Sequence, residues 1–131
     1  MSEATGAGRL LLDTHILLWW LAGSPELSEQ IRERIDTELE VYVSSASVWE
    51  LSIKKAAGKL KLPDDLINWI QQGGLSELPI TLQHADLAGR LPLIHRDPVD
   101  RMLVAQALAE RLTLVTRDKL IQKYDVPVLE A

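Results

Sequence analysis

The sequence contains no cysteine. Disulfides, thiolate zinc sites and nucleophilic thiols all need that residue, so its absence excludes each of them. The absence also suits a reducing compartment, and we expect the protein in the cytoplasm. The N-terminus has no basic start followed by an apolar core, which gives no indication of a secretory signal.

Long apolar runs are lacking too, and the longest uninterrupted one covers only residues 16–22. A membrane-spanning helix needs about 20 consecutive apolar residues, so we expect no membrane partner. No internal repeat, low-complexity tract or interdomain linker is visible. A chain of 131 residues is long enough for one core and too short for two. We therefore expect a single domain at residues 9–131, after a flexible lead-in at residues 1–8.

Positive charge is in deficit, and the formal net charge is −5. This balance argues against a protein that coats nucleic acid non-specifically. The basic residues form two groups, one of Lys54, Lys55, Lys59 and Lys61, the other of Arg90, His95, Arg96 and Arg101. Each group alone is best interpreted as solvated helix surface. An acidic protein still binds RNA where metal ions neutralise its carboxylates and local lysines meet the phosphates.

Strand and helix patterns alternate along the chain. The apolar residues 9–12 end abruptly at Asp13, and a second apolar run follows at 16–22, which predicts a buried strand and then a helix with Thr14 near its start. Further strands are expected at residues 40–44, 78–80, 113–116 and 126–129. Helical patterns separate these strands. We therefore predict a three-layer α/β/α domain around a central, mostly parallel sheet with right-handed crossovers.

Four acids follow these strands. Asp13 ends the first strand, Glu50 lies in the first turn of a helix expected at residues 47–57, Asp100 begins a helix at 99–111, and Asp118 comes two residues after Thr116. The carboxyl ends of parallel strands share one edge of a sheet, which is where open sheets place their ligands. We expect Asp13, Glu50, Asp100 and Asp118 to meet at that edge.

Each acid also has a structural interpretation, because helix N-termini favour Asp and Glu. Glu50 completes a capping box if Ser47 caps the helix, Asp118 caps its own short helix, and Asp97 caps the helix that begins at Pro98. Asp13 is the exception, since an acid at the end of an apolar strand needs a partner. The coincidence of four acids at one edge favours a site over four separate caps.

Carboxylates this close repel one another unless a cation lies between them. All-oxygen ligand sets favour Mg²⁺ or Mn²⁺ over zinc, and these ions promote phosphodiester hydrolysis. Thr14 and Thr116 flank the acids and are expected to orient them. The histidines His15, His84 and His95 have no zinc-like spacing, so we interpret each as a surface or packing residue rather than a metal ligand. His15 is the least secure of these because it is two residues from Asp13.

Four motifs resemble the acidic motifs of PIN-domain ribonucleases, and within that family they are most similar to the VapC toxins of bacterial toxin–antitoxin pairs. The motifs are Asp13-Thr14-His15, Ser45-Ala46-Ser47-Val48-Trp49-Glu50, Asp97-Pro98-Val99-Asp100-Arg101-Met102-Leu103-Val104-Ala105-Gln106-Ala107, and Thr116-Arg117-Asp118. The likeness runs from residue 10 to about residue 129. Each motif is weak alone, and the ordered set is specific.

The resemblance implies a Mg²⁺- or Mn²⁺-dependent endoribonuclease that inhibits translation, forms a homodimer and is neutralised by a cognate antitoxin. By position, Asp13, Glu50, Asp100 and Asp118 fall on the catalytic and metal-binding acids. Thr14 and Thr116 fall on the neighbouring hydroxyl positions. Asp97 is an extra acid in the third motif, which we assign to Asp100 because Asp100 precedes the long apolar helix in register with the family. The sequence identifies neither the RNA that is cut, the RNA-binding residues nor the antitoxin.

Two other functions remain open. One is a non-catalytic Mg²⁺-binding interaction or signalling module of α/β fold, such as a phosphoreceiver domain, although such a domain normally has two adjacent acids after its first strand. The other is a catalytically silent PIN-like scaffold, which the presence of all four acids disfavours.

The helix expected at residues 16–22 is apolar on every face. Adjacent residues of a helix point about 100° apart, so Trp19 and Trp20 cannot both face the sheet. Either a neighbouring helix covers the remaining apolar side chains, or a partner chain does. We predict that a second protomer or an antitoxin segment buries at least one of the two tryptophans.

Overall fold

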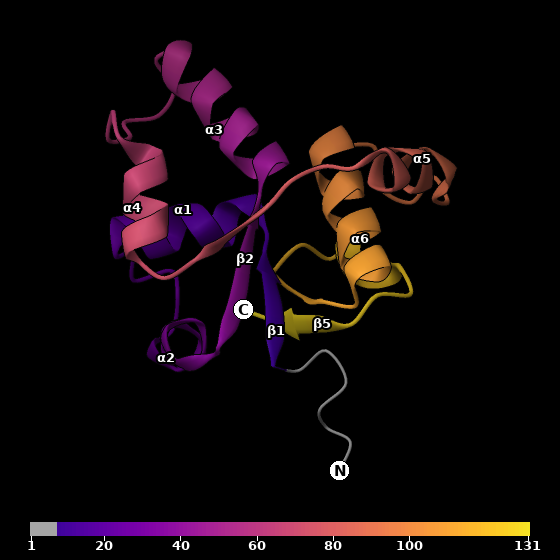
Figure 1. Cartoon of the computed structure of the whole chain (residues 1–131), viewed down its shortest axis with the longest axis horizontal. Coiled ribbons are helices and arrows are strands. Elements are labelled where there is room, and N and C mark those ends of the chain that lie inside the picture. The colour runs from indigo at the N-terminus through magenta and orange to yellow at the C-terminus, as the bar shows by residue number, and fades with distance from the viewer. Residues whose placement is uncertain (1–7) are drawn as a thin grey trace.

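A computed structural model describes residues 8–131, so the predicted lead-in at residues 1–8 falls outside the described part except for Gly8. Strands and helices alternate along this part of the chain (Figure 1). The elements are β1 (Arg9–Leu12), α1 (Thr14–Ala22), α2 (Glu29–Thr37), β2 (Glu40–Ser44), α3 (Ser45–Ala56), α4 (Leu66–Gln72), β3 (Ser76–Leu78), α5 (Leu82–Arg90), α6 (Pro98–Glu110), β4 (Thr113–Thr116), the 3-10 helix η2 (Ile121–Lys123) and β5 (Val128–Glu130).

The sheet has five strands in the order β3-β2-β1-β4-β5, and every pair is parallel. β1 is the central strand, and its residues Leu10, Leu11 and Leu12 are fully buried. A parallel strand with both faces covered has a continuous apolar run instead of an alternating one, which explains the sequence of β1. Because all strands point the same way, β1, β2 and β4 end at the same edge of the sheet.

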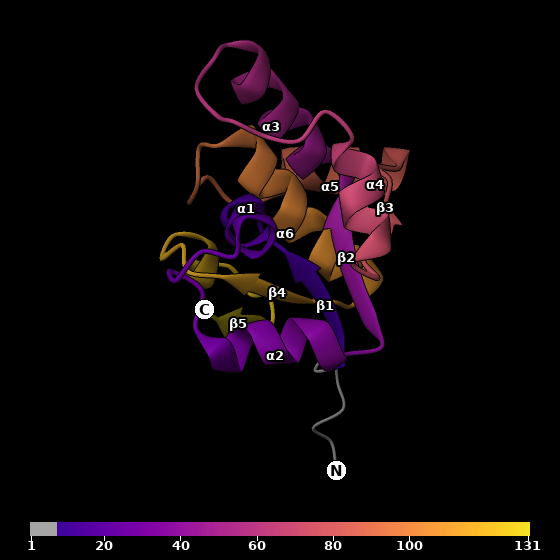
Figure 2. The same cartoon turned by 90° about the vertical axis from the view of Figure 1, so that its left-hand side faces the viewer.

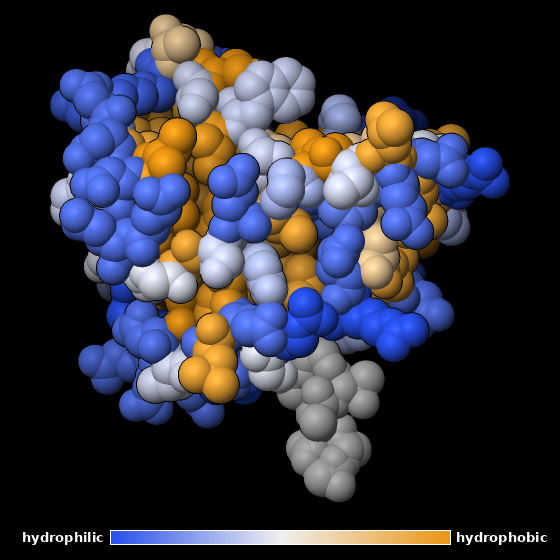
Figure 3. Space-filling view, viewed as in Figure 1, coloured by the Kyte–Doolittle hydropathy of each residue, from blue (hydrophilic) through white to orange (hydrophobic). Residues whose placement is uncertain are grey.

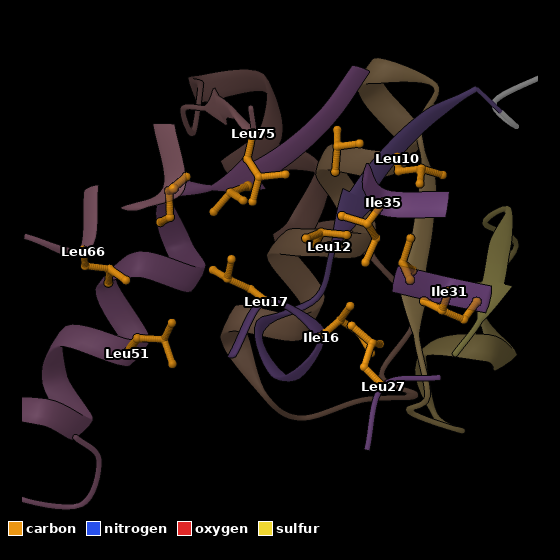
Figure 4. Packing of buried hydrophobic residues seen from close by; sticks show 14 residues of the cluster. Leu10, Leu12, Ile16, Leu17, Leu27, Ile31, Ile35, Leu51, Leu66 and Leu75 are labelled. Carbon is orange, nitrogen blue, oxygen red and sulfur yellow. The ribbon is translucent and has the colours of Figure 1, made fainter. Parts of the chain in front are cut away.

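Helices cover both faces of the sheet (Figure 2). On one face Leu10 and Leu12 belong to a cluster with apolar side chains of α1, α2, α3 and α4 (Figure 4). On the other face Leu11 and Leu114 pack with Leu103 and Val104 of α6, and α5 packs outside against α6. This arrangement confirms the predicted three-layer α/β/α architecture. No helix within residues 8–131 has the length and apolar character needed to cross a membrane.

Some element boundaries differ from those expected. Helix α3 begins at Ser45, because Ser44 is its N-cap and accepts a hydrogen bond from the Ala46 N–H at 3.0 Å. Glu50 therefore lies in the second turn of the helix, and the predicted first-turn position was wrong. Strand β3 ends at Leu78 instead of extending to residue 80, since Pro79 has no N–H to donate. After Asp118 the expected helix is reduced to the short η2.

Trp19 and Trp20 of α1 are both half-buried by residues of this chain. The indole N–H of Trp20 donates a hydrogen bond to Asp36 at 3.1 Å. The indole ring packs against Gly73 so closely that a Cβ atom added at Gly73 would lie 2.2 Å from the ring. The guanidinium of Arg117 lies over the Trp19 ring, 4.6 Å from its centroid. Neighbouring elements thus cover part of each ring, and burial by a partner chain stays a prediction.

Candidate metal and catalytic site

Asp13 lies at the end of β1 and is only 3% exposed. It is the N-cap of α1, and its carboxylate accepts a hydrogen bond from the Ile16 N–H at 3.0 Å. Its second oxygen accepts a short hydrogen bond from the Thr116 hydroxyl at the end of β4. Burial raises the pKa of Asp13, and the bonds from Thr116 and Ile16 oppose that rise. The Thr116 hydroxyl and the Ile16 N–H are thus the partners that a buried acid at the end of an apolar strand needs.

The two threonines act differently. Thr116 joins two acids, because its hydroxyl donates to Asp13 and accepts the Asp118 N–H at 3.0 Å. Thr14 is also buried, but its hydroxyl donates to Ser47 Oγ at 2.9 Å and connects the start of α1 to α3. The structure therefore places Thr116 against the acids as expected, and it places Thr14 against a serine instead.

Asp100 and Asp118 lie together with His95, and one potential ligand atom of each falls within 4.8 Å of the others. The imidazole Nε2 is 3.0 Å from Asp100 Oδ2 and 3.1 Å from Asp118 Oδ2. Burial tends to raise the pKa of Asp118, but bonds from the Ile121 N–H, from His95 and from the Leu120 N–H prevail and hold that pKa below its ordinary value. Asp118 is not the N-cap of η2, which is Leu120, but it accepts two N–H groups at the start of that helix and also has a place in the cluster.

Asp100 has the most perturbed carboxyl group of the cluster. Burial, reinforced by the charges of Asp97, Asp13 and Asp118 and opposed by His95, raises the pKa of Asp100 to about 7. A carboxylate held this close to other acids is stabilised when a cation neutralises them. Carboxylate oxygens are the donors that Mg²⁺ and Mn²⁺ prefer, so the residues at this edge fit a divalent ion.

Glu50 does not belong to this cluster in the described structure. Its carboxylate lies 3.3 Å from Lys54 Nζ, one turn further along α3. The capping-box interpretation fails as well, because Ser44 caps α3 and the Ser47 hydroxyl is bonded to Thr14. Asp13 and Asp118 both influence Asp100, so the structure brings three of the four predicted acids to one edge and leaves Glu50 paired with Lys54.

Asp97 caps α6, as its structural interpretation predicts. Its carboxylate accepts hydrogen bonds from the N–H groups of Val99 at 2.8 Å and Asp100 at 3.2 Å. Asp97 therefore fixes the start of the helix that carries Asp100, and its charge contributes to the raised pKa of that acid.

The interpretation of His95 as a surface or packing residue was wrong, because its side chain lies between two of the acids and is 11% exposed. The spacing between histidines gave no indication of this position of His95. The available signal was its position, two residues before the cap that opens α6. His84 does behave as a packing residue: it is buried and bonded to Glu110 at 2.8 Å. His15 is exposed.

The basic groups have mixed roles. Lys54 pairs with Glu50, Lys55 pairs with Asp64, and Arg90 pairs with Asp86, all at or near the surface. Arg101 departs from the predicted solvated surface, because its guanidinium donates to backbone carbonyl groups at the end of α5 and in the segment between α5 and α6. It therefore supports the fold beside the site.

An apolar hollow lies between α3 and α4. Its lining includes Val48, Ile67, Ile70 and Leu75. Large apolar side chains are also exposed on the same two helices, and Figure 3 shows apolar surface in this region. They are Trp49, Ile53, Ile67 and Trp69.

The family model described as "PIN domain" matches residues 10–127 of the chain. The chain belongs to the PIN-domain family. A curated PIN-domain relative, Ribonuclease VapC22 of Mycobacterium tuberculosis (strain ATCC 25618 / H37Rv), is 31% identical over 123 residues, which cover 90% of this chain and 93% of the relative. The family assignment predicted from the four motifs is confirmed.

Solved structures share the PIN-domain fold seen here. The VapBC2 complex from Rickettsia felis, bound to a DNA fragment from its promoter, contains a chain with a TM-score of 0.70 and 17% identity, covering 92% of this chain and 97% of that one. The DNA-bound VapBC complex from Salmonella typhimurium contains a chain with a TM-score of 0.70 and 20% identity, and the match covers 93% of this chain and 97% of that one. At this identity the likeness concerns the fold alone.

Proposed function

We propose that this PIN-domain protein is a metal-dependent endoribonuclease that acts as the toxin of a toxin–antitoxin pair and inhibits translation. The observation that carries the proposal is the convergence of Asp13, Asp100 and Asp118 at one sheet edge, in a chain that matches the PIN domain from residue 10 to residue 127. The ribonuclease name of VapC22 supports this activity.

In this proposal Asp13, Asp100 and Asp118 hold Mg²⁺ or Mn²⁺. Glu50 is the fourth acid of the site, and its ion pair with Lys54 is no obstacle, because partly exposed pairs on a helix are worth only about 0.3–0.5 kcal/mol. When bound, the ion supplies a water activated for attack and neutralises charge on the phosphate and the leaving oxygen.

The chain's own groups orient these acids. Thr116 fixes Asp13 by donating a hydrogen bond to it, and it accepts the N–H of Asp118, so the ends of β1 and β4 are held together. The Leu120 and Ile121 N–H groups bind one oxygen of Asp118 and leave the other directed at the cluster. Preorganised ligands of this kind spare the cost of reorganisation when substrate binds.

RNA and an antitoxin are the partners that this function needs. Single-stranded or looped RNA fits best, because its phosphates and bases are accessible. The similar solved chains come from VapBC toxin–antitoxin assemblies, which supports an antitoxin partner here. The apolar hollow between α3 and α4 and the half-buried Trp19 and Trp20 offer surfaces for the antitoxin or for a second protomer. We place the protein in the cytoplasm.

Asp13→Asn tests the proposal. Asn is also a good N-cap, so the bond to the Ile16 N–H is retained while a ligand charge is removed. Mn²⁺ binding measured by calorimetry and cleavage of an RNA panel should both fall at least tenfold, and EDTA should abolish cleavage by the wild type. Full activity of the variant, or undiminished cleavage in EDTA, contradicts the proposal. Metal binding by the wild type without any cleavage favours the interaction or signalling module instead.

A further inference from the structure

We infer that His95 is a positioning residue of this site, whose imidazole holds Asp100 and Asp118 by donating from Nε2 and does not ligate the metal. The inference rests on the metal site of the proposed function. It goes beyond that proposal by giving a role to a side chain outside the four acids.

The contacts of His95 bridge two acids from different elements. Nε2 lies 3.0 Å from Asp100 Oδ2, which comes from the first turn of α6, and 3.1 Å from Asp118 Oδ2, which follows β4. Two carboxylates that share one donor are brought together in spite of their mutual repulsion. His95 thereby sets the spacing of the two oxygens that face the cluster.

The second ring nitrogen decides between donor and ligand. Nδ1 accepts a hydrogen bond from the Asp97 N–H at 3.2 Å. A ring nitrogen that accepts a hydrogen bond carries no proton, so an accepting Nδ1 leaves the ring proton on Nε2. Ligation through Nε2 would require the proton on Nδ1, where it would face the Asp97 N–H. His95, Asp100 and Asp118 alone resemble a metal-binding triad. The hydrogen bond from the Asp97 N–H to Nδ1, however, makes Nε2 of His95 a donor.

The Asp97 N–H is not free to turn away. Asp97 caps α6 through its side chain, with bonds to the N–H groups of Val99 and Asp100. The same residue therefore anchors the helix that carries Asp100 and fixes the ring of His95. Any movement of the Asp97 backbone that released Nδ1 would also disturb the helix cap.

The backbone of His95 is anchored as firmly as its ring. Its N–H donates to the Tyr124 hydroxyl at 2.9 Å, and that hydroxyl donates to the Pro92 carbonyl at 2.8 Å. The Arg101 guanidinium donates to the carbonyl groups of Ala88 near the end of α5 and of Leu91, Pro92 and His95 in the segment that follows. Together these bonds fix where the imidazole enters the site.

His84 provides an internal comparison. Its Nδ1 accepts the Thr81 N–H at 3.1 Å, and its Nε2 is bonded to Glu110 at 2.8 Å. Here too a backbone N–H at Nδ1 leaves Nε2 as the donor to a carboxylate. His95 has the same arrangement, with the difference that its donor faces two acids of the proposed site.

The first test compares Mn²⁺ affinity, by calorimetry, in the wild type, His95→Gln and His95→Leu, with His15→Gln as the matched control at an exposed histidine. The glutamine amide nitrogen reaches close to the position of Nε2 and still donates, so affinity should stay within about threefold of the wild type. Leucine fills the space without a donor, and affinity should fall about 10–100-fold, as is common when a residue that orients a metal ligand is removed. His15→Gln should match the wild type.

The second test is spectroscopic and does not depend on how well the leucine variant folds. Pulsed electron paramagnetic resonance of Mn²⁺ bound to the wild type should show no coupling to an imidazole nitrogen. An imidazole coupling that disappears in His95→Gln overturns the inference and makes His95 a ligand. Equal affinity in the wild type, the glutamine variant and the leucine variant overturns it too, and leaves the proposed function standing. A wild type that binds no Mn²⁺ refutes the metal site itself, and the inference falls with it.

Discussion

Asp100 is a carboxyl group whose ionisation opposes folding when no metal is bound. Its pKa in the folded protein is about 7, against about 3.9 in an unfolded chain. Between these values the folded state binds more protons than the unfolded state, so the free energy of unfolding falls as the pH rises from about 4 to about 7. Below this range Asp100 is protonated in both states, and the loss of stability disappears.

Asp100→Asn should therefore stabilise the metal-free protein at neutral pH. We expect its free energy of unfolding in urea with EDTA at pH 8 to exceed that of the wild type by about 1–2 kcal/mol. This is less than half of the roughly 4 kcal/mol that the pKa shift alone implies, because a charge at a helix N-terminus and the contact of Asp100 with His95 are lost. At pH 4 the two proteins should be equally stable. Mn²⁺ should raise the Tm of the wild type and not that of the variant. Equal stability at both pH values would contradict the raised pKa.

Substitution of Glu50 tests whether its carboxylate contributes to RNA cleavage or only to stability. Glu50→Gln removes only a partly exposed ion pair with Lys54, so unfolding free energy should change by about 0.5 kcal/mol or less. Cleavage of RNA should fall by orders of magnitude if Glu50 is the fourth acid of the site. Lys54→Gln is the matched control for stability, since it breaks the same ion pair and leaves the carboxylate. A clear loss of Tm with activity retained would return Glu50 to a structural role.

At the level of elements, sequence patterns predicted most helices and strands because their signals are local. The buried run of β1 and the Asp97-Pro98 start of α6 need no knowledge of the rest of the chain. The start of α3 was missed because Ser44, Ser45 and Ser47 are all acceptable caps, and only the end of β2 selects Ser44. His95 was missed because a histidine in an irregular segment has no periodicity that indicates its direction.

The segment between α5 and α6 depends on Arg101. A lysine at this position has one ammonium group and cannot reach four carbonyl groups at once. Arg101→Lys should lower the free energy of unfolding by about 2–3 kcal/mol and should speed hydrogen exchange of residues 91–97.

Arg90→Gln is the matched control for this change, because its ion pair with Asp86 is exposed. It should cost about 0.5 kcal/mol or less. Similar losses in the two variants would show that the carbonyl bonds of Arg101 do not hold the segment.

At the level of the whole molecule, the alternation of strands and helices predicted the three layers. Strand polarity predicted that four acids meet at one edge, and the structure brings Asp13, Asp100 and Asp118 there but not Glu50. The strand order and the ion pair of Glu50 with Lys54 were beyond that reasoning. The strand order depends on how distant segments pack, which local patterns do not specify. The ion pair of Glu50 with Lys54 is a contact between neighbouring turns of one helix, and it was missed because Glu50 was assigned only to the site or to a helix cap.

The tryptophans of α1 test the proposed assembly. Trp19 and Trp20 keep exposed surface after packing beneath Arg117 and on Gly73. Replacing the partner-facing tryptophan with Ala or Ser should weaken dimerisation or antitoxin binding at least tenfold, as expected for a tryptophan at the centre of an interface. Light scattering and antitoxin titration measure the two effects, and circular dichroism checks the fold. Unchanged behaviour of both single variants would make this stretch ordinary core.

The central position of β1 also sets the point during synthesis of the chain at which the proposed site can form. β1 pairs with β4, and the bond between Asp13 and Thr116 joins residues 103 positions apart. A nascent chain on the ribosome therefore carries Asp13 long before the residues that complete its surroundings have been made. For most of its translation the polypeptide has no assembled cluster, and contacts between such distant residues also form slowly. Under the proposed function, cleavage of RNA therefore begins only after β4 has emerged and docked beside β1.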